Sequence, residues 1–154
     1  MNAKYKILSQ AIEKMTKTDS SQAIHPLLFL VPFVQVAWAE GFVQASERRA
    51  ILCLAADIGV TSRHPDFGEL LEWLEDRPTD EFFAESIEKL RDFLAELPPE
   101  QSESLRNILQ IGCLKVSEAA GEIGFLRGRS RTTPEEREEV FRLGERLGFA
   151  PALA

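Results

Sequence analysis

Residues 36–51 of the chain read VAWAEGFVQASERRAI, and their main features recur in residues 116–149. In each copy an apolar stretch with helical spacing ends at a glycine, Gly41 or Gly121, and a loop follows. Each loop leads to a second helical stretch that opens with Glu-Arg and ends before another glycine. Glycine is common just after a helix because it adopts positive φ at little cost. The repeat therefore predicts two helix–loop–helix units.

The second helices of the two units align at one constant offset, with Glu47 matching Glu136 and Ile51 matching Val140. The first helices align at a smaller offset because the second loop is longer. Loop insertions cost little free energy, so this is the pattern expected of a diverged duplication. We expect the two units to pack about a pseudo-twofold axis.

Helical periodicity continues through nearly all of the chain, and we find no segment with a convincing strand pattern. We therefore expect an all-α fold, a single compact bundle of about seven helices. One domain would span residues 1–154, with repeat halves at about 27–60 and 105–149 and an N-terminal helix and connector in 1–22. Pro32 lies inside the expected helix 27–40, so that helix either begins near Val31 or is kinked.

The 154-residue chain is 44% apolar and 28% charged, a balance typical of globular proteins, and its formal charge is -7. This negative charge argues against nucleic-acid binding, which needs a basic face. The longest apolar run, residues 27–39, is too short for a transmembrane helix, and the charged N-terminus does not resemble a signal peptide. We expect a cytoplasmic protein with no membrane insertion, and the sequence leaves the oligomeric state open.

The two cysteines, Cys53 and Cys113, each lie in an apolar helical stretch with no cysteine or histidine beside them. We expect both to be buried free thiols in a reducing compartment. No C-x-x-C spacing indicates a zinc or redox site.

Four glutamates mark the repeated units. Glu47 and Glu136 fall where an N3 glutamate caps the start of a helix, which is sufficient reason for their presence. Glu40 and Glu118 instead lie near the ends of their helices, where a negative charge opposes the helix dipole. The simpler interpretation is that both are solvated, and the alternative is that they serve a site.

If the two units pack about a pseudo-twofold axis, the carboxyl groups of Glu40, Glu47, Glu118 and Glu136 converge. Four carboxylates without histidine suit a hard divalent cation such as Ca²⁺, Mg²⁺ or Mn²⁺. They do not suit a structural zinc site, and the Glu-x-x-His pair of di-iron bundles is missing. These four residues are the metal ligands that the sequence predicts, and we predict no catalytic residue.

The same residues resemble a known family. Residues 36–43 followed by 47–51 are similar to the signature of the TerB-like domains, named for tellurite resistance. Residues 116–121 with Glu136 resemble the second half of that signature, and residues 73–78 its middle segment. The resemblance covers roughly residues 27–149.

The resemblance implies an all-helical domain with internal pseudo-symmetry, an acidic patch implicated in metal binding, and a role in tellurite or other chemical and phage stress. By position, that patch comprises Glu40, Glu47, Glu118 and Glu136. The chain departs from the family pattern at Glu40, where the family usually has aspartate. It departs again at Glu122, where the family often has a second glycine.

Two functions follow from the sequence. The first is a non-enzymatic stress-response module whose acidic face binds a divalent cation or a protein partner. The alternative is a carboxylate-metal enzyme of unknown substrate. The enzyme interpretation lacks a nucleophile, base or cofactor loop that the sequence reveals.

Overall fold

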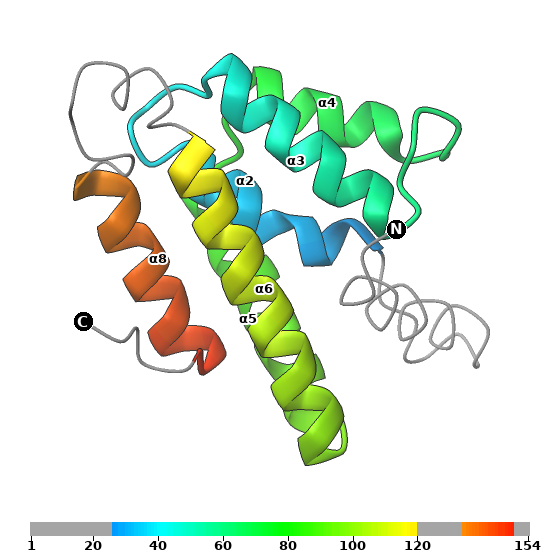
Figure 1. Ribbon diagram of the computed structural model, residues 1–154, viewed down its shortest axis with the longest axis vertical. Coiled ribbons are helices and arrows are strands. Elements are labelled where there is room, and N and C mark those ends of the chain that lie inside the picture. Colours follow the sequence, from blue (N-terminus) through cyan, green and yellow to red (C-terminus); the bar gives the residue numbers. More distant parts are fainter. Residues whose placement is uncertain (1–25, 120–133, 150–154) are drawn as a thin grey trace.

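The computed structural model describes residues 26–119 and 134–149, which pack into one helical body (Figure 1). All regular structure in these residues is helical, in agreement with the predicted all-α class. The elements are the 3-10 helix η1 (Pro26–Leu30) and the α-helices α2 (Val31–Ala37), α3 (Ala45–Asp57), α4 (Phe67–Glu75), α5 (Asp80–Glu96), α6 (Pro99–Ala119) and α8 (Pro134–Leu147). The expected helix within residues 1–22 and the second loop lie outside the described residues.

Helix α2 is the centre of the fold. It contacts η1, α3, α5, α6 and α8, and nearly all of its side chains are buried. A helix that is apolar all round is stable only when its neighbours cover every face. Pro32 lies in its first turn, where no helical hydrogen bond is lost, so the helix begins at Val31 and η1 precedes it.

The long helices α5 and α6 form an antiparallel hairpin, and α6 lies in front of α5 in Figure 1. Helix α8 packs beside both of them. Thr79 caps α5 as its sequence position predicts, since its hydroxyl accepts a hydrogen bond from Phe82 N at 3.0 Å. Pro99 opens α6, the position at which proline is best tolerated in a helix.

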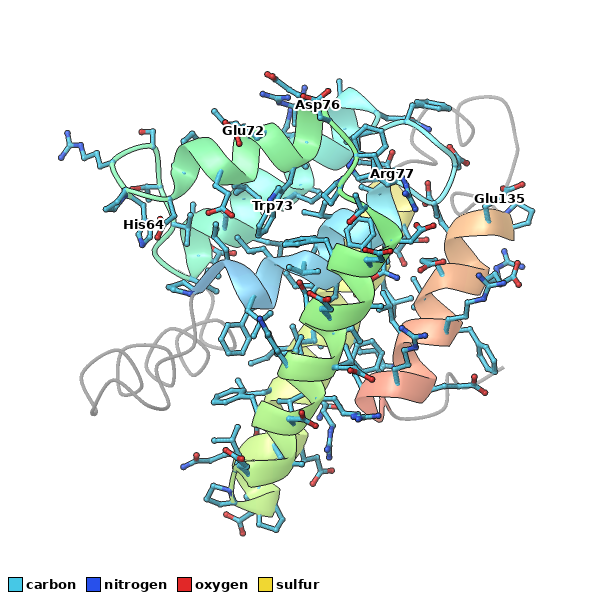
Figure 2. The ribbon with its side chains drawn as sticks, turned by 180° about the vertical axis from the view of Figure 1, so that it is seen from behind. His64, Glu72, Trp73, Asp76, Arg77 and Glu135 are labelled. Carbon is cyan, nitrogen blue, oxygen red and sulfur yellow. The ribbon has the colours of Figure 1, made fainter. Side chains whose placement is uncertain are left out.

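Helices α3 and α4 lie side by side at the top of the view in Figure 1. Figure 2 shows Trp73 on α4, and its backbone carbonyl accepts a hydrogen bond of 2.7 Å from the indole of Trp38, just after α2. Both tryptophans are partly buried and pack against the core. Their apolar positions in the sequence predicted core residues, and the structure places them at the core's edge.

The prediction that both cysteines are buried is wrong for one of them. Cys113 is buried in α6, whereas Cys53 is exposed on α3. Cys53 sits between Leu52 and Leu54 in a continuous apolar run, but a helix has a single inward face here. Leu54 takes that face, which turns Cys53 outward.

None of the helices among the described residues is long and apolar enough to cross a membrane. Gly41 and Gly59 both adopt φ of +94°, after α2 and α3 respectively. Gly59 directly follows Ile58, the C-cap of α3, and so terminates that helix as the repeat predicts. The predicted helix end at Gly41 is wrong, because α2 ends at Ala37 with Trp38 as its C-cap and Gly41 lies in the turn beyond it.

Helices α2 and α6 pack together at Gly112. A Cβ atom at this position would overlap the ring of Phe33, which is itself buried. The crossing of these two helices therefore requires a residue without a side chain at position 112.

Gly112→Ala is expected to destabilise the fold by about 1–3 kcal/mol, because the Phe33 ring has no free space to move into. Gly68→Ala is the matched control, since a Cβ there meets nothing within 4 Å and Gly68 also lies in a helix. That control should be neutral or stabilising by about 0.5 kcal/mol. Urea unfolding measures both, and equal stability of the two variants would contradict the proposed role of the crossing.

Candidate functional site

Three of the predicted glutamates lie close together where α3, α6 and α8 meet. Glu40 lies in the turn after α2, Glu47 in the first turn of α3 and Glu136 in the first turn of α8. Ser117, near the end of α6, joins them. We call Glu40, Glu47, Ser117 and Glu136 the carboxyl junction. The loop after α2, the start of α3, the end of α6 and the start of α8 all gather at the upper left of Figure 1.

Glu47 caps α3, as its N3 position predicts. Its Oε1 accepts a hydrogen bond from the backbone N–H of Gln44 at 2.9 Å, and Gln44 is the N-cap residue. Unlike most capping glutamates, Glu47 is 0% exposed. Capping therefore explains one oxygen of Glu47 but not the burial of the whole carboxyl group.

Glu136 occupies the corresponding position in the first turn of α8 and is also 0% exposed. Its expected capping partner, Thr133, lies outside the described residues, so that prediction stays untested. Glu136 contacts Glu47 and the hydroxyl of Ser117 instead. Capping glutamates are ordinarily solvated, whereas Glu47 and Glu136 are both buried.

Burial dominates the electrostatics of Glu136. Burial, the negative charges of Glu47 and Glu40 and the hydrogen bond with Glu47 together raise the pKa of this carboxyl group to about 9, while the Ser117 hydroxyl acts to lower it. Burial disfavours a charged carboxylate because the group loses its hydration. Glu136 therefore holds a proton at neutral pH.

The pKa of Glu47 is raised to about 7, again chiefly by burial. The Gln44 N–H and a hydrogen bond from Glu136 favour the ionised form of Glu47, and the charge of Glu40 opposes it. A protonated Glu136 thus donates to the carboxylate of Glu47. The two groups titrate as one coupled pair rather than as independent acids.

Glu40 lies at the rim of the carboxyl junction and is partly exposed. Its Oε2 accepts a hydrogen bond from Gln44 Nε2 at 3.4 Å, which links it to the cap of α3. Its charge acts on both buried glutamates. Glu40 therefore lies within electrostatic reach of the two buried glutamates, in a turn rather than in the last turn of a helix.

Glu118 is exposed on α6, next to the buried Ser117. No interaction described in the structure joins Glu118 to the other three carboxyl groups, so its share in the site stays a prediction. Ser117 was missed by the sequence analysis. Its spacing in the sequence could have predicted that Ser117 is buried, because it lies four residues after Cys113 and therefore on the same inward face of α6.

The junction is not a ready-made cage for a metal. Among residues 26–119 and 134–149, no group of three or more histidine, cysteine, aspartate or glutamate side chains is arranged to hold an ion. Glu47 and Glu136 supply two carboxyl groups at one point, and Glu40 supplies a third negative charge nearby. This arrangement can exchange a proton for a cation that needs few protein ligands.

Comparison with known proteins identifies no family for this chain. No protein-family model, no curated protein and no solved structure matches it. The resemblance to the TerB-like domains therefore rests on the sequence motifs alone.

The buried pair predicts that stability falls as pH rises. Both folded-state pKa values lie above the ordinary value of 4.5, so the folded protein binds more protons than the unfolded chain between about pH 5 and pH 9. The contribution of the pair is fully retained below pH 4.5 and lost above about pH 9. One excess bound proton gives a slope of up to about 1.4 kcal/mol per pH unit.

Glu136→Gln should remove the slope between about pH 7 and pH 9 and stabilise the protein there, because an amide cannot ionise, while the part below pH 7 that comes from Glu47 should remain. Glu135→Gln is the control, since Glu135 is the exposed neighbour in the same helical turn (Figure 2). Urea unfolding at several pH values measures the slope. A slope unchanged by Glu136→Gln would show that Glu136 does not titrate as described.

Proposed function

We propose that this chain is a non-enzymatic helical module that binds a hard divalent cation at the carboxyl junction. The observation that carries the proposal is the burial of two contacting glutamates, Glu47 and Glu136. Two buried carboxyl groups in contact with each other oppose folding when both are ionised, so they indicate a functional site.

A cation at this junction takes the place of the shared proton. Glu47 and Glu136 would be its protein ligands, and Glu40 would add negative charge at the rim. Mg²⁺ keeps several of its waters and is commonly held by one or two carboxylates, whereas Ca²⁺ takes six to eight oxygen ligands. The small ligand set therefore favours Mg²⁺, or Mn²⁺ in the same role, over Ca²⁺.

We also infer that the two helix pairs arose by duplication and are related by a pseudo-twofold axis. Glu47 and Glu136 support this inference, because each lies in the first turn of the second helix of its unit and each is fully buried. A duplicated unit that meets itself at one matched residue places two copies of that residue together.

The stress-response context, tellurite resistance included, comes from the TerB-like motifs alone, and a protein partner of such a system is part of the same proposal. A cytoplasmic location is supported by the two free thiols, Cys53 and Cys113, since free cysteines are typical of reducing compartments.

Calorimetric titration with Mg²⁺, Mn²⁺, Ca²⁺ and Zn²⁺ at pH 7.5 tests the proposal. We expect heat from Mg²⁺ or Mn²⁺ and a raised melting temperature. Ligand at about a hundred times its Kd stabilises a folded protein by about 2.7 kcal/mol. Affinity should rise with pH, because the cation competes with the shared proton.

Glu136→Gln and Glu47→Gln should each abolish this binding, while Glu135→Gln should leave it unchanged. Glu118→Gln asks separately whether the fourth predicted ligand takes part. Absence of heat with all four cations, or binding that persists in both buried-site variants, would refute the cation site.

A further inference from the structure

The outward face of α3 carries a second stripe suited to packing against another helix. Its residues line an open groove of about 410 Å³ and follow the spacing i, i+3, i+4, i+7, i+8, i+11. This is the spacing of a helix–helix seam. The lining residues are Ala45, Arg48, Arg49, Leu52, Cys53 and Ala56.

This stripe is separate from the face that α3 uses in its own fold. Ile51, Leu54 and Ala55 point inward and are buried. Cys53 and Ala56 point outward and are exposed, and their small side chains allow a neighbouring backbone to approach closely. The helix thus has one apolar face inside the fold and a second on the surface.

One flank of the outward stripe has a self-complementary charge pattern. Arg49, Cys53 and Asp57 follow at intervals of four residues, with the positive charge before the cysteine and the negative charge after it. Among the described residues, no ion pair involves Arg49 or Asp57. Asp57 ends α3, where a negative charge opposes the helix dipole, so its presence calls for another cause.

We propose that a second copy of this chain binds here, with the two α3 helices packed antiparallel about a twofold axis near Cys53. In that arrangement Arg49 of each copy faces Asp57 of the other, and the two Cys53 side chains lie close together. A twofold interface uses one patch twice, so a pattern that is symmetric about one residue with opposite charges at its ends fits it.

Residues 1–25 of the same chain are the competing occupant. Their sequence has apolar residues at helical spacing, but it also carries Lys4, Lys6, Lys14 and Lys17 against the acids Glu13 and Asp19. This excess of positive charge would approach Arg48 and Arg49 in the groove. Charge complementarity therefore favours a second copy, which brings Asp57 to Arg49.

The outward stripe belongs to a single helix of 13 residues, so the interface is smaller than the roughly 1,600 Å² typical of stable complexes. We therefore expect a reversible dimer. Its population should depend on concentration in the micromolar range, and salt should weaken it, because its ion pairs are exposed.

Sedimentation equilibrium on the full chain tests the pairing by charge reversal. Arg49→Asp and Asp57→Arg should each weaken dimerisation at least about tenfold, because each places like charges opposite one another at two symmetric points. The double variant R49D/D57R restores both pairs and should regain wild-type affinity. Arg91→Asp, an exposed reversal on α5, is the control and should change nothing.

Cys53 provides an independent readout. A short bismaleimide should crosslink two wild-type copies through Cys53, with Cys113 unreactive because it is buried, and Cys53→Ala should abolish the crosslink while preserving the dimer. A wild-type protein that stays monomeric overturns the proposal. So does a double variant that fails to recover, or a monomer whose Cys53 is protected from maleimide, which would indicate the chain's own residues 1–25.

Discussion

The crossing of α2 and α6 at Gly112 is the constraint on which the rest of the structure depends. The Phe33 ring occupies the space that any side chain at position 112 would need. Because α2 is short and buried on nearly all sides, this contact also fixes the turn that follows it. The start of α3 is thereby held close to the end of α6, where the carboxyl junction forms (Figure 1).

That junction brings together two groups whose burial opposes folding when both are ionised. The fold reduces this cost in two ways. Each glutamate lies in the first turn of a helix, where the helix dipole favours negative charge, and Gln44 N donates a hydrogen bond to Glu47. The shared proton then removes one of the two charges. A site with these properties suits the proposed exchange of that proton for a cation.

Much of the architecture could be predicted from the sequence, because it is encoded locally. Helical periodicity predicts the all-α class, Thr79 predicts the start of α5, and Gly59 predicts the end of α3. The exposure of Cys53 could not be read from its apolar neighbours, since three consecutive apolar residues cannot all face one side of a helix.

The site was predictable in its residue types but not in its geometry. The matched positions of Glu47 and Glu136 predicted that they meet if the two units pack about a twofold axis, yet local rules assign both to solvent-exposed caps. Their burial and their contact with Ser117 depend on how α3, α6 and α8 pack. No short sequence motif encodes that packing. The same limit applies to Glu118, whose spacing alone suggested a ligand.

A carbon-13 NMR titration of the glutamate carboxyl groups tests the central claim most directly. The account predicts that the Glu47–Glu136 pair still holds a proton at pH 7 in the metal-free protein and releases it when Mg²⁺ is added. Full ionisation of both carboxyl groups by pH 6, with no change on adding Mg²⁺, would contradict it.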